Sequence, residues 1–416
     1  MQERSLHILL IVGTFPQLSE TFILRKAIAL AERGHRVTVA TRKCGDWALF
    51  KDYLPLPVGL SIQSLLPEWG WSNPRRAMAL IAGLAIHSFR SPIRAINLIN
   101  TSHRDLATRN MPWRQFVRHL PFVKMRSDVV HFEYLGLGAM YPLVPKLLAT
   151  PMVVSCRGTE LHLFEQHSHQ QRAAFEDCLK RAAAIHCVSN SMANKVADVS
   201  NRENSRTSGI WVNRPAVATD KITPKNNWPG NHPPLILAVG RLVWIKGYDY
   251  LLAALSRLKQ SGIAFRAQII GDGPLAAPLR YSIEDLDLKP EVELLGSLPP
   301  ADVLQLVRSA DLFVLSSHAE GISNAALEAM ALGLPVVTTK AGGMAEAVSD
   351  GVEGYVVPVR DIPALADRLK ILLTDPDQRE RMGRSARFRA EADFSLSRQA
   401  KVFEQLYQSV KSSSNN

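Results

Sequence analysis

Cysteine motifs and long apolar runs are both missing from this sequence of 416 residues. The four cysteines form no C-x-x-C pair, and the twelve histidines show no H-E-x-x-H spacing. This pattern favours reduced thiols in a cytosol over a disulfide framework or a zinc site. No apolar run reaches the roughly 18 residues that cross a bilayer. The polar start, 1–5, leads into the apolar residues 6–12 without a cleavage site, so we expect a first strand there and no signal peptide. The sequence therefore predicts a cytoplasmic protein.

The composition predicts a folded chain with two domains. Apolar residues make up 46% and charged residues 21%, which is typical of globular proteins. The length suits two domains of about 200 residues each. Short β-branched runs alternate with amphipathic stretches, a pattern that predicts an α/β fold of parallel strands and crossover helices. We expect strands at 7–12, 36–40, 129–132, 152–155, 184–188 and 210–213, and then at 235–239, 266–270, 292–295, 312–315, 335–338 and 355–357. Helices are expected at 20–33, with Ser19 as N-cap, and at 170–181.

A Pro-rich and Asn-rich stretch, 219–234, has no periodicity, and we interpret it as a linker. It separates an N-terminal domain, 1–218, from a C-terminal domain, 235–395. The first domain carries a long insertion at about 47–126. A last helix, 396–411, has one apolar face, so we expect it to pack back on the first domain.

Most of the net charge of +11 lies in the insertion. Residues 71–126 contain ten Lys and Arg against one acid, for a local net charge of +9, and apolar side chains lie between the arginines. Such a stretch is typical of a helix at a membrane interface. We expect it to form a patch that docks on an anionic membrane or binds an acceptor substrate. The patch consists of Arg75, Arg76, Arg90 and Arg94. Alternatively, these arginines form a solvated face or hold an acidic glycan.

Two carboxylates eight residues apart, Glu320 and Glu328, follow the strand expected at 312–315. If a helix begins near Ser323, Glu320 lies at the carboxyl end of the strand, where open α/β sheets bind ligands. Glu328 then lies inside the helix. The alternative is a loop charge followed by a solvated helix residue.

The loop after the strand at 235–239 carries two cations, Arg241 and Lys246. An arginine fork and a lysine point charge together suit a diphosphate, although two solvated cations are the alternative. Gly13 and Gly271 also follow strands, where backbone approaches a ligand or simply turns. No G-x-G-x-x-G motif is present, so the nicotinamide fingerprint is missing.

These motifs, followed by Gly-Gly-Met-Ala-Glu at 342–346 and Asp-Gly-Val-Glu-Gly at 350–354, resemble glycosyltransferase family 4. In the first half the resemblance rests on Ser-Glu-Thr-Phe at 19–22 and Arg-Gly-Thr-Glu at 157–160. The helix start at 19–22 and Asn-Arg-Pro-Ala at 213–216 resemble bacterial enzymes that build colanic-acid-type exopolysaccharides. The resemblance implies the GT-B fold, in which two Rossmann-like doubly wound domains face each other across a cleft, and transfer with retention of configuration.

The resemblance also implies roles for individual residues. Arg241 and Lys246 would bind the donor diphosphate, Glu320 the sugar hydroxyls and Glu328 the ribose. Further donor-binding residues would be Gly13, Gly271, Leu295, Gly321, Ile322, Ser323 and Asn324. Arg157 stands where many members have histidine, and an arginine cannot act as a general base because it does not deprotonate. Arg157 is therefore either an electrostatic helper of catalysis or a structural residue.

The predicted function is transfer of a hexose from a UDP-linked or GDP-linked sugar to a growing, lipid-linked, cell-surface polysaccharide, at the inner face of the cytoplasmic membrane. No cofactor, nucleic acid or metal is expected. The two D-x-D patterns, 285–287 and 375–377, lie in helical context, and Asp375 with Pro376 is typical of an N-cap. The alternatives are another GT-B sugar-nucleotide enzyme, an epimerase or phosphorylase, or an inactive scaffold that binds membrane or nucleic acid.

Overall fold

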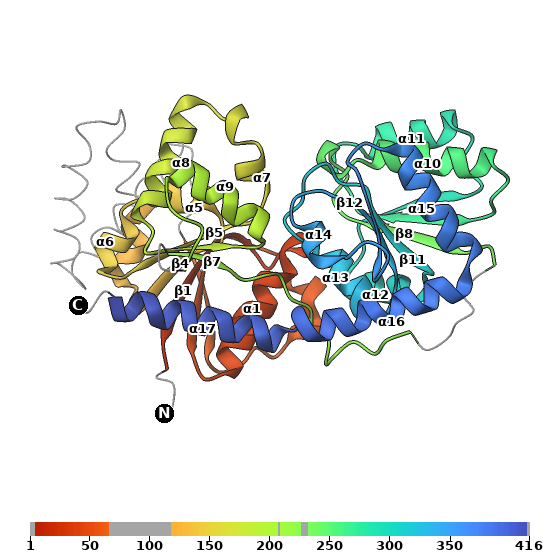
Figure 1. Cartoon of the computed structure of the whole chain (residues 1–416). Coiled ribbons are helices and arrows are strands. Elements are labelled where there is room, and N and C mark those ends of the chain that lie inside the picture. Colours follow the sequence, from red (N-terminus) through yellow and green to blue (C-terminus); the bar gives the residue numbers. More distant parts are fainter. Residues whose placement is uncertain (1–4, 66–117, 207–208, 226–231, 414–416) are drawn as a thin grey trace, which may run out of the picture.

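Two parallel sheets, each covered by helices on both faces, make up the structure, a computed structural model that describes residues 5–65, 118–206, 209–225 and 232–413 (Figure 1). The first sheet has the strand order β3-β2-β1-β4-β5-β6-β7, and the second has the order β10-β9-β8-β11-β12-β13. This is the predicted pair of Rossmann-like domains.

The first sheet consists of β1 (His7–Phe15), β2 (Arg36–Cys44), β3 (Leu60–Ser64), β4 (Val129–Phe132), β5 (Met152–Cys156), β6 (Ala184–Cys187) and β7 (Ile210–Val212). Its α-helices are α1 (Thr21–Glu32), α5 (Leu135–Met140), α6 (Val144–Leu148), α7 (Thr159–His162), α8 (His169–Arg181) and α9 (Asn190–Ser200). Short 3-10 helices are η1 (Leu18–Glu20), η2 (Trp47–Tyr53), η4 (Leu120–Lys124) and η5 (Phe164–Gln166).

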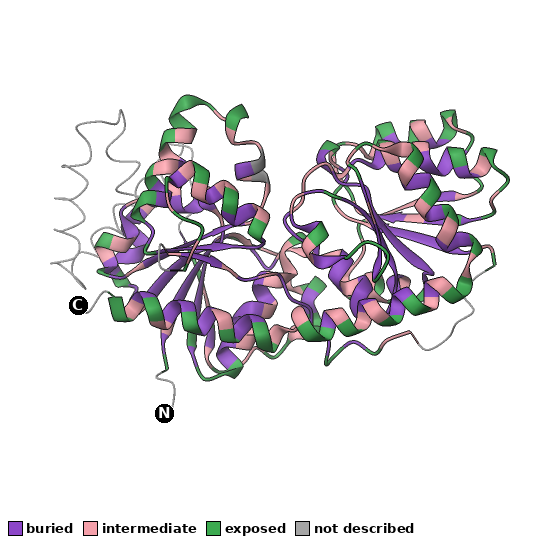
Figure 2. Cartoon of the chain, in the orientation of Figure 1, coloured by how far each residue is buried: buried purple, intermediate pink, exposed green. Residues whose placement is uncertain are grey.

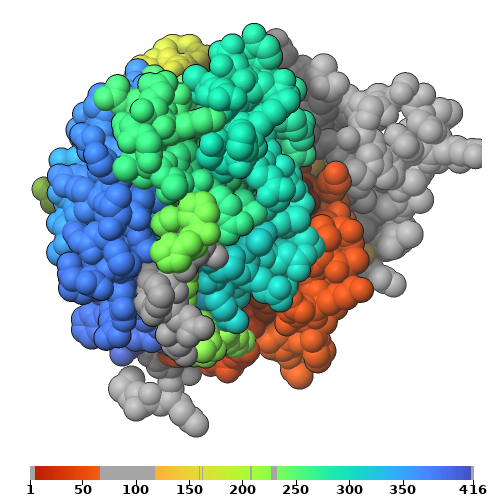
Figure 3. All heavy atoms as spheres, turned by 90° about the vertical axis from the view of Figure 1, so that its right-hand side faces the viewer, coloured from red at the N-terminus to blue at the C-terminus, as the bar shows by residue number. Residues whose placement is uncertain are grey.

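The second sheet consists of β8 (Leu235–Val239), β9 (Arg266–Ile270), β10 (Val292–Gly296), β11 (Leu312–Leu315), β12 (Val336–Thr339) and β13 (Gly354–Val357). Around it lie η6 (Trp244–Lys246), α10 (Tyr248–Gln260), α11 (Ala276–Asp285), α12 (Pro300–Ser309), α13 (Asn324–Ala331), α14 (Met344–Ala347), α15 (Ile362–Thr374) and α16 (Pro376–Asp393). The last helix of the described residues is α17 (Leu396–Ser413). Viewed from the end of the second domain, α10 and α15, which pack together, form neighbouring parts of the surface (Figure 3).

The strand predictions are confirmed to within a few residues in both sheets. Central strands such as β4, β6 and β11 are buried along their whole length (Figure 2). Helices on both faces exclude water from such strands, which is why they read as continuous apolar runs. Asp375 is also confirmed as an N-cap, because its carboxylate accepts a hydrogen bond from Gln378 N at 2.9 Å.

Two local predictions are corrected. β3, which lies within the segment predicted as an insertion, is the edge strand of the first sheet, and η4 is buried in the same domain. Arg75, Arg76, Arg90 and Arg94 lie outside the described residues. Ser19 is not the N-cap of α1, because it is part of η1, and Glu20 takes the cap position without a side-chain hydrogen bond.

The last helix crosses back to the first domain, as predicted (Figure 1). α16 contacts α13 of the second domain, whereas α17 packs on α1. Phe403, Leu406 and Tyr407 of α17 are buried in the same core as β1 and α1. The Tyr407 hydroxyl also lies 2.6 Å from His131 Nδ1 of β4. The carboxyl-terminal helix is therefore part of the first domain's core.

Truncation of a side chain in this core should destabilise the first domain. We expect Leu406→Ala to lower the free energy of unfolding by about 2–5 kcal/mol, because it removes a fully buried leucine side chain and leaves a cavity. Urea denaturation followed by circular dichroism measures the change. Gln405→Ala, an exposed position on the same helix, is the control, and equal effects of the two variants would contradict the packing of α17.

Candidate active site

A cleft of about 1130 Å³ lies between the two domains. Its walls come from α1 and η2 of the first domain and from the loops that follow β5, β8, β9, β10 and β11. The carboxyl ends of parallel strands are where open α/β sheets bind ligands, so this is the expected place for a site.

Most of the predicted site residues meet in this cleft. The predicted residues that line it are Arg157, Arg241, Lys246, Gly271, Glu320, Gly321, Ile322, Ser323, Asn324 and Glu328. Gly13 and Leu295 do not line it. Gly13 lies inside β1, which runs two residues beyond it, and Leu295 packs toward the core of the second domain. Ser297 and Leu298, just beyond Leu295, line the cleft instead.

An ion pair joins the two strongest predicted motifs. Lys246 Nζ lies 2.5 Å from Glu320 Oε2, and both side chains are 16% exposed. Ser317 Oγ donates a hydrogen bond of 3.3 Å to the same carboxylate oxygen. A cation and an anion therefore stand side by side at the carboxyl ends of β8 and β11.

Glycines allow the loops to approach this closely. Gly247 has a φ of 62°, and a Cβ at this position would collide with the carbonyl oxygen of Ser316. Gly271, with a φ of 142°, lies against the carbonyl oxygen of Gly240 in the same way. Any other residue at either position would be strained and would push the loops apart.

Arg241 differs from Lys246 because it is exposed and makes no ion pair with any residue that the structure describes. It lines the same cleft, one loop away from Glu320. A guanidinium with unused donors, next to a lysine, provides a fork and a point charge for phosphate oxygens.

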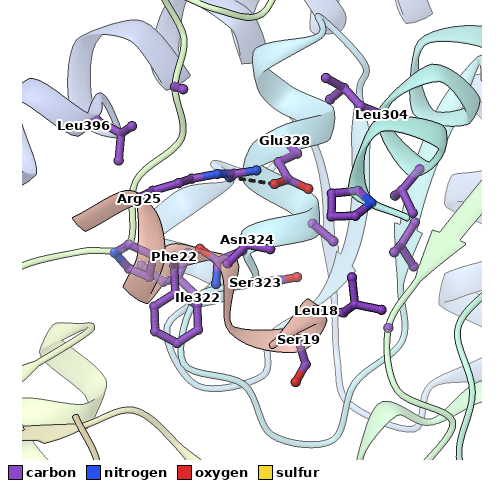
Figure 4. A pocket seen from close by; sticks show the side chains of 18 of the residues that line it. Leu18, Ser19, Phe22, Arg25, Leu304, Ile322, Ser323, Asn324, Glu328 and Leu396 are labelled. Atoms are coloured by element: carbon purple, nitrogen blue, oxygen red, sulfur yellow. Dashed lines mark hydrogen bonds and ion pairs between the residues drawn. The ribbon is translucent and has the colours of Figure 1, made fainter. Parts of the chain in front are cut away.

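Helix α13 begins at the cleft, as predicted (Figure 4). Ser323 is its N-cap, and its hydroxyl accepts a hydrogen bond from Ala326 N at 3.4 Å. The N–H of Ser323 itself points to Met344 Sδ at 3.3 Å, so this group does not face the cleft as an open donor. Asn324 Oδ1 is buried without a hydrogen-bond partner, although the residue lines the cleft. A ligand with a donor group would satisfy this oxygen.

Glu328, one turn further along α13, is bound by a residue of the other domain. Arg25 of α1 reaches across the cleft, and its Nη1 lies 2.7 Å from Glu328 Oε1 (Figure 4). The side chains are 13% and 16% exposed, respectively.

Arg157 is held by contacts with Glu133 and Phe22 of the first domain. Its Nε donates a hydrogen bond of 3.1 Å to the carbonyl oxygen of Glu133, and its Nη2 pairs with the Glu133 carboxylate. Its guanidinium lies over the ring of Phe22, 4.4 Å from the centroid. Lys26 binds the second oxygen of Glu133.

Burial and neighbouring charges shift the pKa values of Glu133 and Lys26 in this cluster. Burial opposes the ionisation of Glu133, but Lys26, His131 and Arg157 outweigh it and lower the pKa of this carboxyl below its ordinary value. Burial lowers the pKa of Lys26 to about 8. The Glu133 carboxylate thus faces two cations, Lys26 and Arg157.

The two domains touch directly beside the site. A Cβ on Gly321 would lie 2.5 Å from the carbonyl oxygen of Arg157, and one on Gly343 would lie 2.5 Å from Ser189 Cβ. Glu346 of α14 reaches the first domain, where it accepts hydrogen bonds from Asn190 N at 3.1 Å and from the neighbouring backbone N–H. Arg214 Nη2 lies 2.9 Å from the same carboxylate.

Sequence reasoning missed several of these residues. Glu133 had a usable signal, since it directly follows the buried strand β4 and therefore stands at the ligand-binding edge of the sheet. The sequence signal for Arg25 was weaker. Thr21, Phe22 and Arg25 lie at helical spacing, and they share the face of α1 that lines the cleft. Nothing local connects Arg25 with Glu328, which is 303 residues away.

No group of three or more His, Cys, Asp or Glu in the described part of the chain is arranged to hold a metal ion. Of the helices in the described ranges, none combines the length and the apolar character that a membrane span needs.

Family models match both domains. Residues 19–208 match the glycosyl transferase 4-like domain, and residues 219–389 match the glycosyl transferases group 1. Together with the two facing Rossmann-like domains, these matches show that the chain belongs to the GT-B glycosyltransferases of family 4.

One curated relative matches most of the chain, and another matches more than half of it. The putative colanic acid biosynthesis glycosyltransferase WcaL of Salmonella typhimurium is 28% identical over 397 residues, which span 91% of this chain and 94% of the relative. The amylovoran biosynthesis glycosyltransferase AmsK of Erwinia amylovora is 31% identical over 57% of this chain and 59% of its own.

Solved structures share the fold. HepE from Anabaena, in complex with UDP and glucose, has a TM-score of 0.70 at 18% identity and covers 97% of this chain and 99% of its own. Sucrose-phosphate synthase from Thermosynechococcus elongatus has a TM-score of 0.72 at 18% identity, covering 99% of this chain and 100% of its own.

The close contact of the domains predicts that Gly343→Ala lowers activity. The added Cβ would collide with the carbonyl oxygen of Gly321 and with Ser189, so the cleft would open by a fraction of an ångström or more. We expect turnover to fall by about a hundredfold, the scale for a 1 Å misplacement of reacting groups. Ala345→Ser, at an exposed position of the same short helix, is the control. Wild-type turnover in Gly343→Ala would show that activity does not depend on the close contact of the two domains at Gly343 and Ser189.

Proposed function

We propose that this glycosyltransferase transfers a hexose from a nucleoside-diphosphate sugar to a growing cell-surface polysaccharide and retains the anomeric configuration. The observation that carries the proposal is the grouping of Arg241, Lys246 and Glu320 at the carboxyl ends of β8 and β11, beside the N-terminus of α13. This edge of the second sheet offers charges for a diphosphate and an acceptor for sugar hydroxyls.

The donor would lie mainly on the second domain, 235–395. Arg241 and Lys246 would bind the diphosphate, and Lys246 has three N–H donors, so it can bind a phosphate oxygen while it keeps Glu320. Glu320 would accept hydrogen bonds from the sugar, and Glu328 would accept one from the ribose. Ser297 and Leu298 line the cleft where the base would lie.

The reaction needs stabilisation of the leaving group more than a protein base. The bond between the anomeric carbon and the β-phosphate oxygen breaks, and the acceptor oxygen bonds to that carbon on the same face. The acceptor proton passes to the departing phosphate. The configuration is retained because the new bond forms on the face from which the phosphate leaves. Arg241 and Lys246 would stabilise the charge that develops on the diphosphate. Arg157, already paired with Glu133, would contribute through its field rather than as a general base.

The acceptor would lie on the first domain, 1–218. The WcaL relative is named for colanic acid biosynthesis and the AmsK relative for amylovoran biosynthesis, which supports a bacterial exopolysaccharide as the acceptor. We propose a lipid-linked glycan, because the basic residues at 71–126 suit a membrane surface. The enzyme would then act as a peripheral protein at the inner face of the cytoplasmic membrane.

A nucleotide panel tests the donor site. HepE structures hold UDP or UDP-glucose, so UDP is the first ligand to try, followed by GDP and ADP. We expect one of them to raise the melting temperature, since a ligand at a hundred times its Kd adds about 2.7 kcal/mol to the free energy of unfolding. Arg241→Ala should reduce the shift and lower kcat/KM for the donor sugar roughly a hundredfold.

Arg257→Ala, an exposed arginine on α10 outside the cleft, is the matched control for Arg241→Ala. Absence of stabilisation by all three nucleotides, together with absence of donor hydrolysis, would refute the proposed function.

Vesicle co-sedimentation tests the membrane proposal. Each basic residue near an anionic leaflet contributes about 1 kcal/mol, so binding to anionic liposomes should be strong at low salt and weaken as salt screens the charges. Replacement of Arg75, Arg76, Arg90 and Arg94 by Gln should abolish it without loss of nucleotide binding. A control with equal charge loss replaces the exposed second-domain residues Arg257, Arg266, Arg280 and Arg381. Equal binding to neutral and anionic vesicles would count against electrostatic docking.

A further inference from the structure

Arg25 is a residue of the first domain whose charged group lies within the half of the cleft formed by the second domain. It projects from α1, and its guanidinium binds Glu328 of α13 at 2.7 Å (Figure 4). Both residues line the cleft and both side chains are largely buried. The pair therefore stands inside the proposed donor site rather than on the outer surface.

Arg25 is also held by a contact within the first domain, which does not depend on Glu328. Arg25 Nε donates a hydrogen bond of 3.1 Å to the Tyr53 hydroxyl. The Tyr53 ring packs on Phe50, with centroids 6.3 Å apart, and Phe50 is 2% exposed in the core of the first domain. A guanidinium that is anchored in this way loses little side-chain freedom when it binds a carboxylate.

Glu328 keeps one oxygen for a ligand. Arg25 occupies Oε1, whereas Oε2 has no hydrogen-bond partner among the described residues. A carboxylate can accept several hydrogen bonds at once, so a ribose hydroxyl at Oε2 need not displace Arg25. The arginine fixes the orientation of the carboxylate.

We propose that Arg25 is a positioning residue of the nucleotide site that the first domain contributes: it orients Glu328 toward the ribose and couples closure of the two domains to nucleotide binding. This proposal rests on the proposed function, in which Glu328 accepts a ribose hydroxyl. The coupling is reciprocal, because any contact that favours the closed cleft also favours the nucleotide that binds it.

The chain contains a natural comparison for this pair. Arg214 also reaches across the domains, and it binds Glu346 at 2.9 Å, but neither residue lines the cleft. Glu346 would keep its hydrogen bonds from Asn190 and Ser191 if Arg214 were removed. Loss of Arg214 thus removes a cross-domain ion pair without touching the nucleotide site.

Calorimetric titration of Arg25→Met with UDP, GDP and ADP tests the proposal. We expect the affinity for the nucleotide that the wild type binds to fall about tenfold, within the usual range of coupling between sites. The KM for the donor sugar should rise to a similar extent, while kcat stays within about twofold, because Arg25 contacts no reacting atom. Arg214→Met, which loses a cross-domain ion pair but no contact inside the cleft, should weaken nucleotide binding clearly less than Arg25→Met does. Arg25→Lys, which keeps the charge without the planar fork, should recover part of the affinity.

A double-mutant cycle identifies the route of the effect. If Arg25 acts through Glu328, Arg25→Met should add little to the loss that Glu328→Gln causes alone. Full additivity of the two losses would overturn the positioning role. So would wild-type or tighter nucleotide binding by Arg25→Met, provided that Glu328→Gln binds more weakly. Failure of the wild type to bind any of the three nucleotides would instead refute the proposed function, and the role of Arg25 with it.

Discussion

Burial of α17 against the first sheet fixes where the second domain lies. α16 packs on α13, and two residues later α17 enters the core of the first domain. The linker returns to the same junction, where Val217 pairs with Ser395 and Arg387 donates to the carbonyl oxygen of Thr219 at 2.9 Å. With the domains held there, glycines at 321 and 343 let them meet beside the site, and the charged loops face each other across a narrow space.

Charges in the cleft are divided unequally between the domains. The second domain presents Arg241 without an ion pair among the described residues and Lys246 with one, while the first domain pairs both Lys26 and Arg157 with Glu133. A donor diphosphate would therefore find its strongest attraction on the second domain. The two cations of the first-domain cluster are already bound to Glu133, so they would need little rearrangement if charge developed in the cleft.

The sequence was most informative where the physics is local. Buried parallel strands appear as apolar runs, and the helix start at Ser323 follows from its capping chemistry, so both were predictable. β3 was missed because its edge position leaves alternate residues exposed and shortens the apolar signal. Ser19 has the right chemistry for a cap, yet η1 displaces the helix start by one residue. The partnership of Arg25 with Glu328 depends on how two domains meet, and no pattern within either segment encodes that distance.

The position of α17 has a consequence for how the protein is made. Its apolar face belongs to the core that β1 and α1 form, yet it is translated after the whole second domain. During synthesis, the face of the first sheet that α17 covers stays exposed until the whole second domain has been translated. Synthesis of the second domain is thus complete before the core of the first domain can be.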